Sequence, residues 1–392
     1  MPDLDPPKEF AYDPPTRLIT AGPAGATRFD QPSAGWSSKF GAFVDDSRFQ
    51  AFAFGQRNRE VGDDMKAVWY DRQGPAAEVL TFGELADPEP ATGEVRVRLY
   101  ASGVNPADCN RRRGAGFVMD YPRVITHSDG AGVIDCVGAE VDPGRIGQRV
   151  WLYNGQRGRA FGTACEFITL TANLVSELPE SVSFAEGACL GIPCMTAHLS
   201  TYIDGSVANQ TVLVTGGAGA VGNYAIQWAK WGGAKVVTTV SSPAKAEHAT
   251  RAGADLVIDY RTEDVATRVK SFTGGQGVDR VVDVDFGGNL ATNLECLKAS
   301  GGVIAYYASR GDPNPDLPAY ELMRHNACVH AIMLPTAPVA LRRQAQADIF
   351  RWLSEGPRLH TIAATFPLVA TVQAHETVEA GTKLGTVVVE IA

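Results

Sequence analysis

Short runs of apolar residues, broken by glycine and proline, dominate the chain from residue 64 to about residue 190. Gly93–Leu99 (GEVRVRL) alternates apolar and charged side chains, as a strand with one buried face does. Similar short runs occur at residues 65–70, 132–135, 149–152 and 164–168. Short strands with this punctuation are typical of a β-rich, barrel-like module. We therefore predict a β domain over residues 64–190.

The pattern changes to alternating strands and helices in the second half of the chain. Residues 211–215 (TVLVT) form a continuous apolar run, as a strand buried on both faces requires. Further strands are predicted at 235–240, 256–258, 279–284 and 302–306, with helices at 221–231, 244–252 and 289–299. A βαβ series of this kind predicts an α/β fold with a doubly wound parallel sheet, assigned to residues 191–334.

The two ends of the chain differ from these segments. Residues 1–63 contain seven of the 23 prolines and no sustained period, so we expect a poorly ordered N-terminal extension. Residues 335–392 predict a helix, a strand, a second helix and a last strand, at 341–354, 361–368, 371–381 and 385–391.

Composition narrows the class of protein. A net charge of -9 argues against a nucleic-acid partner held by a basic face. No run of about 18 apolar residues predicts a membrane span, and the first residues lack a secretory pattern, so a cytoplasmic protein is expected. The seven cysteines form no C-x-x-C pair, so no zinc ribbon is predicted.

A glycine-rich loop joins the first strand of the βαβ series to its helix. Residues 216–222 (GGAGAVG) follow the pattern G-x-x-G-x-x-G. Such glycines turn the chain, admit a pyrophosphate close to the backbone and let helix and strand pack closely. The free N–H groups of the helix start attract phosphate. The predicted cofactor contacts are Gly216, Gly219, Ala220, Val221 and Gly222.

The end of the second strand of this series bears on the choice between NAD and NADP. NAD sites carry an acidic residue there to bind the ribose 2′-hydroxyl. Here the strand ends in Thr239-Val240-Ser241-Ser242, without an acid. Ser241 and Ser242 can donate hydrogen bonds, and Lys245 supplies a positive charge one helical turn later. The pattern favours NADPH.

These motifs resemble the medium-chain dehydrogenase/reductase superfamily, in particular its zinc-independent zeta-crystallin/quinone oxidoreductase branch. The resemblance extends from Met65 to Ala392. Its motifs are Met65–Val68, Ser102–Pro106, Ser128–Gly132, Gly187–Pro193, the loop 216–222 and Tyr306–Gly311. It implies a GroES-like β-barrel domain, formed by residues 64–190 and 335–392, with a Rossmann domain between them. It also implies a homodimer or homotetramer.

The resemblance assigns roles to further residues. It places Asn105 beside the nicotinamide ribose, where it would position the reacting groups, and Thr196 at the nicotinamide. It places Lys245 and Tyr260 beside the adenosine 2′-phosphate. Several relatives have a tyrosine in the substrate pocket five residues after the asparagine, whereas this chain has Asn110.

Zinc alcohol dehydrogenases of the superfamily bind a catalytic zinc at three positions. The matching residues here are Asn105, Ser128 and Ile192, and an isoleucine cannot be a ligand. Without a Lewis acid, the acceptor should yield an anion that delocalises its own charge, as a quinone or an enone does. Tyr121, Tyr306 and Tyr307 are candidate proton donors if they face the cleft, and packing in the core is an equal alternative for each. Tyr121 and Tyr307 are also candidate pocket residues.

Three functional hypotheses remain open. The first is hydride transfer from NADPH to a quinone. The second is reduction of enones or enoyl thioesters, in which Arg111–Arg113 would either bind an anionic carrier or form a solvated loop. The third is a non-catalytic, crystallin-like NADPH-binding protein, because an intact phosphate loop serves either role.

Overall fold

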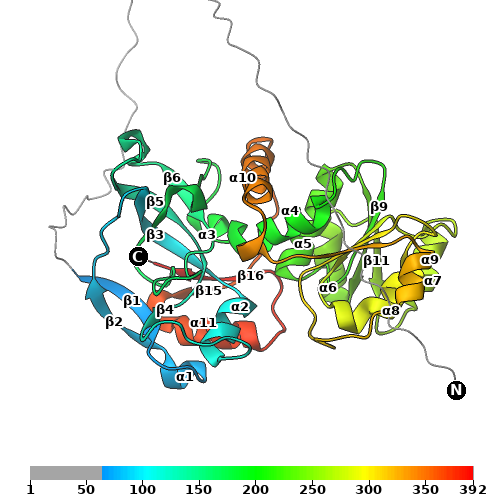
Figure 1. Ribbon diagram of the computed structural model, residues 1–392, viewed down its shortest axis with the longest axis horizontal. Coiled ribbons are helices and arrows are strands. Elements are labelled where there is room, and N and C mark those ends of the chain that lie inside the picture. Colours follow the sequence, from blue (N-terminus) through cyan, green and yellow to red (C-terminus); the bar gives the residue numbers. More distant parts are fainter. Residues whose placement is uncertain (1–63, 392) are drawn as a thin grey trace, which may run out of the picture. The chain divides into compact units, whose positions relative to one another are not determined.

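The computed structural model describes residues 64–391, and the predicted extension 1–63 lies outside them. The described chain contains an α/β domain and a β domain, whose elements can be followed along the chain in Figure 1. Within this range no helix has both the length and the apolar character needed to cross a lipid bilayer.

The α/β domain contains a six-stranded sheet in the order β11-β10-β9-β12-β13-β14, with every pair parallel. The strands are β9 (Thr211–Val214), β10 (Lys235–Val240), β11 (Leu256–Asp259), β12 (Arg280–Asp283), β13 (Val303–Tyr306) and β14 (Cys328–Ala331). The helices between them are α5 (Ala220–Trp231), α6 (Pro243–Arg251), α7 (Val265–Phe272), α8 (Phe286–Cys296) and α9 (Ala319–Arg324). The strand order reverses at β9, and ligands of such sheets bind beyond the carboxyl ends at that point.

The β domain contains a larger sheet in the order β15-β16-β3-β5-β6-β8, with β7 also paired to β3, and a small sheet β2-β1-β4. The N-terminal strands are β1 (Asp64–Tyr70), β2 (Thr81–Ala86), β3 (Glu94–Val104), β4 (Val124–Ile125), β5 (Asp129–Val137), β6 (Arg149–Leu152), β7 (Phe167–Thr171) and β8 (Val175–Glu177). Short helices α1 (Ala76–Val79), α2 (Pro106–Arg113) and α3 (Phe184–Gly187) interrupt them.

The C-terminal strands complete this sheet. Strand β16 (Thr386–Glu390) pairs in parallel with β15 (Ile362–Pro367) and antiparallel with β3, and helix α11 (Thr371–Glu379) lies between β15 and β16 in the chain. Val387, Val388 and Val389 are fully buried, so this strand is part of the core. A β domain built from two distant segments, plus a doubly wound parallel sheet, confirms the predicted fold class.

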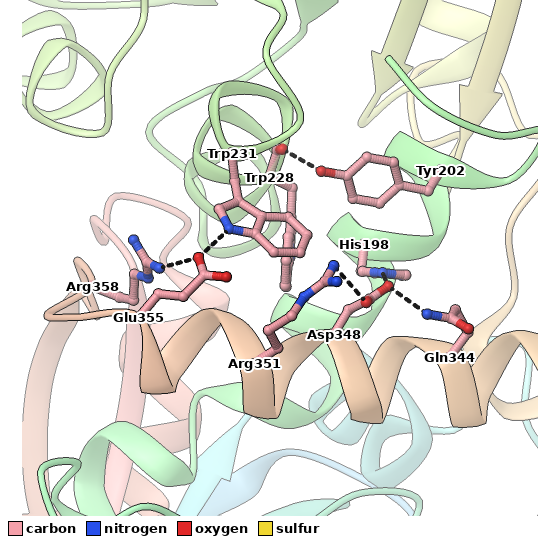
Figure 2. Close-up of polar contacts among 9 residues, drawn as sticks. All are labelled: His198, Tyr202, Trp228, Trp231, Gln344, Asp348, Arg351, Glu355 and Arg358. Carbon is pink, nitrogen blue, oxygen red and sulfur yellow. Dashed lines mark hydrogen bonds and ion pairs between the residues drawn. The ribbon is translucent and has the colours of Figure 1, made fainter. Parts of the chain in front are cut away.

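Helix α10 (Val339–Ser354) packs on α4 (Met195–Tyr202) through a partly buried carboxylate, that of Asp348. Figure 2 shows Asp348 accepting from His198 Nε2 at 2.9 Å, from Gln344 at 3.0 Å and from Arg351 at 3.1 Å. These bonds, that of His198 first, hold the pKa of Asp348 below its ordinary value. The carboxylate therefore stays charged. It joins α4, which precedes the α/β domain in the chain, to α10, which follows it.

A second carboxylate, that of Glu355, forms hydrogen bonds at the C-terminal end of α10. Glu355 accepts from Trp231 Nε1 at 2.6 Å and from Arg358 at 3.3 Å (Figure 2). The ring of Trp228 packs edge-on against His198 at 5.0 Å. Buried aromatic rings whose polar groups are hydrogen-bonded contribute both apolar area and a fixed orientation. These contacts therefore hold together the two places where the chain passes between the β domain and the α/β domain.

The structure corrects several element predictions. Helix α8 begins at Phe286, three residues before the expected start, and helices α2, α7 and α9 were not predicted. His325 caps the end of helix α9, and His330 lies in strand β14. Strand β7 begins at Phe167, because the chain before it forms only an isolated bridge between Cys165 and Ala67.

Candidate active site

The glycine loop has the shape of a phosphate cradle. Gly216 has φ +66°, which favours glycine. A Cβ on Gly217 would lie 2.0 Å from Thr238 Oγ1, and one on Gly222 would lie 2.4 Å from the Gly216 oxygen. Gly219 ends the loop as the N-cap of α5, so the first N–H groups of that helix lack helical partners. The shape of the loop therefore leaves room for a pyrophosphate group close to the backbone.

Hydroxyl groups and one ammonium gather where β10 and β11 end. Lys245 Nζ donates to Ser241 Oγ at 2.9 Å, and Ser242 Oγ accepts from the Lys245 amide at 3.4 Å as the N-cap of α6. The Tyr260 amide donates to Val240 O at 3.1 Å, which places this exposed ring beside the same edge. Among residues 64–391 no carboxylate forms an ion pair with Lys245, so its charge is available for an anion.

Asn105, Ser128 and Ile192 converge on two buried carboxyl groups. Asn105 Nδ2 and the Ile192 amide donate to Asp129 Oδ2 at 2.7 Å and 2.8 Å. The backbone N–H of Asn105 and the hydroxyl of Ser128 donate to the Asp108 carboxyl group at 2.8 Å and 3.2 Å. Asn105 is the N-cap of α2, so this helix start is fixed by its own third residue, Asp108. Asn105, Ser128 and Ile192, which match the zinc-binding positions of zinc alcohol dehydrogenases, thus bind carboxyl groups here.

Burial raises the pKa of both of these carboxyl groups, Asp108 and Asp129. It raises the pKa of Asp108 to about 6, against the opposing charge of Arg111. Burial and the neighbouring Asp108 raise the pKa of Asp129 well above its ordinary value. The sequence analysis missed both residues, although an acid three positions into a helix that begins Asn-Pro is a recognisable signal. Asp129 fixes the Asn105 side chain, and Asp108 fixes its backbone N–H.

A chain of hydrogen bonds connects a buried histidine pair, one member of which lies on α11, to the backbone of Asp129. Thr163 donates its hydroxyl proton to the Asp129 carbonyl at 2.7 Å, so Ser102 must donate to Thr163, at 2.7 Å. Ser102 then accepts from His127 Nδ1 at 2.9 Å, and His127 Nε2 accepts from His375 Nε2 at 2.9 Å. Burial lowers the pKa of both imidazoles, that of His127 to about 3, which keeps them neutral. His127 is therefore a hydrogen-bonded core residue.

Within the part of the chain that the structure describes, no three His, Cys, Asp or Glu side chains are grouped so that they could hold a metal ion. The buried cysteines are free thiols. Burial raises the pKa of Cys109 and of Cys189 to about 12, so neither is a thiolate ligand at neutral pH.

Thr196 is connected to these groups through the backbone. It lies in the first turn of α4, four residues after Ile192, and its side chain is buried. The preceding segment (Leu190–Cys194) is kinked at Gly191, where a Cβ would lie 2.1 Å from Asp129 Oδ1. Gly191 thus permits the close approach of this segment to Asp129, the carboxyl group that also binds Asn105.

The C-terminal segment adds a cation that sequence reasoning missed. Gly219 of the loop forms a parallel bridge with Gly385, just before β16. Lys383 Nζ donates to the Gly385 carbonyl, and burial lowers the pKa of this lysine. A half-buried ammonium beside the phosphate cradle is suited to a pyrophosphate. Its only sequence signal was a lysine shortly before the last predicted strand.

The predicted pocket residues do not form one group. Tyr121 donates to Gly158 O at 2.6 Å and lines a pocket together with Arg111, the neighbour of Asn110 in α2. Tyr307 follows β13 in the other domain, where its side chain packs against the core and burial raises its pKa. The structure therefore places Tyr307 outside the pocket of Tyr121.

Comparisons with known proteins agree with this geometry. Residues 91–180 match the family model described as alcohol dehydrogenase GroES-like domain, and residues 220–354 match zinc-binding dehydrogenase. A quinone oxidoreductase of Pseudomonas aeruginosa is 33% identical over 235 residues, 60% of this chain and 71% of the relative. A 2-haloacrylate reductase of Burkholderia sp. is 28% identical and covers 83% of this chain, with 98% of the relative matched.

Among solved structures, Escherichia coli quinone oxidoreductase complexed with NADPH has a TM-score of 0.73 and 26% identity. The match covers 83% of this chain and 99% of that structure.

Proposed function

Because this chain belongs to the quinone oxidoreductase family of the medium-chain dehydrogenases/reductases, we propose that it transfers hydride from NADPH to a quinone without zinc. The observation that carries the proposal is the set of bonds around Asn105. Asn105, Ser128 and Ile192 are bound to the carboxyl groups of Asp108 and Asp129 and offer no ligand set for a metal.

NADPH is the cofactor, and its nicotinamide supplies the hydride. The N–H groups at the start of α5 and the ammonium of Lys383 bind the pyrophosphate. Lys245, Ser241 and Tyr260 bind the 2′-phosphate, since an ammonium and hydroxyl donors at this edge meet no competing carboxylate. Asn105 and Thr196 position the nicotinamide end. The likeness to a family member solved with NADPH supports this choice.

The acceptor follows from the absence of a Lewis acid in the proposed mechanism. Reduction of a simple ketone creates an alkoxide, which needs strong stabilisation. A quinone gives a hydroquinone anion that spreads its charge over the ring, so a few hydrogen-bond donors suffice. The remaining task of the protein is to hold a flat acceptor against the nicotinamide.

Reduction of α,β-unsaturated carbonyl compounds is the second candidate. An enone likewise yields a delocalised anion, the enolate, so the same site serves both reactions. The relative named 2-haloacrylate reductase favours this candidate, because its named substrate is an unsaturated carboxylate.

The protein assembles as a homodimer or homotetramer through the edge strand β14. Its Val329 is exposed, and exposed apolar side chains accompany it on α9 and beyond, namely Tyr320, Met323 and Met333. An exposed sheet edge with an apolar patch is a pairing surface. Light scattering on wild type and on Val329→Lys tests this, and a monomeric wild type would refute it.

The deciding experiment follows NADPH oxidation at the nicotinamide absorbance, with a chelator present. The acceptors are an ortho-quinone, a para-quinone and a simple enone, and each is repeated with NADH. Chelator-insensitive turnover of a quinone with NADPH supports the proposal, whereas turnover of the enone alone favours the second candidate. Tight NADPH binding without turnover would favour a binding protein, and loss of activity on chelation would contradict the zinc-free mechanism.

A further inference from the structure

One pocket of the β domain is strongly basic. It lies between the C-terminal half of α2 and two loops, residues 117–121 and 156–159. Its charged lining residues are Arg111, Arg157, Arg159 and Asp120, so three positive groups face one negative group. Tyr121 joins the two loops by donating to Gly158 O at 2.6 Å, which fixes the pocket wall.

Within residues 64–391, these three arginines differ from their neighbours in having no ion-pair partner. Arg112 pairs with Glu379, and Arg123 pairs with Asp71 at 2.7 Å. Among residues 64–391, by contrast, Arg159 makes only a long bond of 3.5 Å to Thr169.

Arg111 is held in place by neutral groups. Its guanidinium donates to Gln156 and lies 5.4 Å from the Phe117 ring. Burial lowers the pKa of Arg159, against the opposing charge of Glu94. Uncompensated, partly desolvated cations are costly unless an anion joins them. The arrangement is therefore that of a binding site.

The pocket shares two segments with the Asn105 site. Helix α2 begins beside Asn105, and Arg111 lies six residues later, about 9 Å along the helix axis. The loop that contains Arg157 and Arg159 starts at Gly155, whose amide donates to Ser128 O at 2.9 Å. The pocket and the Asn105 site are therefore built on the same two segments, α2 and the loop that starts at Gly155.

We propose that this pocket binds an anionic group, carboxylate or phosphate, carried by the hydride acceptor, an inference that rests on the proposed function. Guanidinium groups bind both anions through paired hydrogen bonds. Phe117, Val118 and Met119 form an apolar wall of the same pocket, which suits the ring or chain that carries the anion. The acceptor class is thus an anionic quinone or an anionic unsaturated carbonyl compound.

The test compares kcat/KM for matched acceptors: 1,4-benzoquinone and its carboxylated analogue, and a simple enone and an unsaturated carboxylic acid. A phosphate-bearing quinone separates the two anion sources. The wild type should prefer the anionic member of each pair. Arg159→Gln and the double variant with Arg157→Gln should lower that preference about 10- to 100-fold, the range for hydrogen bonds to charged groups. Arg343→Gln, an exposed arginine on α10, is the matched control and should keep it.

The outcomes separate this inference from the proposed function. Turnover of neutral quinones without any preference for anions would overturn the pocket assignment and leave the proposed function standing. If no acceptor is turned over, the proposed function fails, and the pocket is tested by calorimetry with benzoate and inorganic phosphate. Binding by the wild type that is lost in Arg159→Gln would support the pocket, and equal or absent binding in both proteins would refute it.

Discussion

Replacement of Lys245 by glutamine tests the cofactor assignment most directly. Lys245 Nζ already donates to Ser241 Oγ at 2.9 Å, so the ammonium is in place before a ligand arrives. Lys245→Gln removes the charge but keeps a hydrogen-bond donor on a long side chain. The Ser242 cap of α6 depends on the Lys245 amide rather than on its side chain, so the helix should remain intact.

The expected size of the effect follows from the exposure of the site. A hydrogen bond to a charged group contributes about 1.5–3 kcal/mol. Lys245 is only partly buried, so we take the lower half of that range, and NADPH affinity should fall about 10- to 40-fold. NADH has no 2′-phosphate, and its affinity should change less than about twofold. The NADPH effect should also shrink as salt is raised.

The assay is equilibrium titration of each cofactor by nicotinamide fluorescence. Lys235→Gln is the matched control, because Lys235 is exposed at the opposite end of the same strand, β10. Equal weakening of NADPH and NADH by Lys245→Gln would show a general structural defect. Unchanged NADPH affinity would refute the assignment of this edge to the 2′-phosphate.

Three further outcomes are expected. Gly222→Ala should weaken NADPH binding at least about tenfold in titrations, because its Cβ would meet the Gly216 oxygen at 2.4 Å. Asn105→Ala should lower both kcat and the unfolding free energy in urea, the latter by about 1–3 kcal/mol, since Asp129 loses a buried partner. His127 has a folded pKa of about 3, below its unfolded value, so its neutral form stabilises the fold above about pH 6.5 and this contribution is lost as pH falls toward 3. The stability difference between wild type and His127→Gln should therefore shrink between pH 7 and pH 4 in urea titrations, and a constant difference would contradict the account.

The cofactor half of the proposed site rests on sequence signals that are local. The loop 216–222 lies between a buried strand and a helix, and Lys245 lies one turn into the next helix. Each position is set by the regular geometry of the βαβ unit. The resemblance implied that the last strand returns to the β domain, and β16 does pair with β3.

The histidine pair and the contacts of Asp129 could not be predicted, since the residues that meet are far apart in the chain. His127 meets His375 across 248 residues, and Asp129 meets the Ile192 amide across 63. Such contacts depend on tertiary packing rather than on any period of the sequence. The sequence predicted only part of the arginine pocket. The run Arg111–Arg113 was evident, but only the fold shows that Arg112 pairs with Glu379 and that Arg111 lines the pocket.

The central position of β16 has a consequence for synthesis on the ribosome. Strand β3 ends at Val104, and its partner β16 begins at Thr386. At about 5–20 residues per second, β3 waits on the order of 15 to 60 s for that partner. Every strand of the α/β domain has emerged by then, so this domain can fold while the earlier-made β domain still exposes an unpaired edge. The α/β domain can therefore complete its fold during translation before the β domain does.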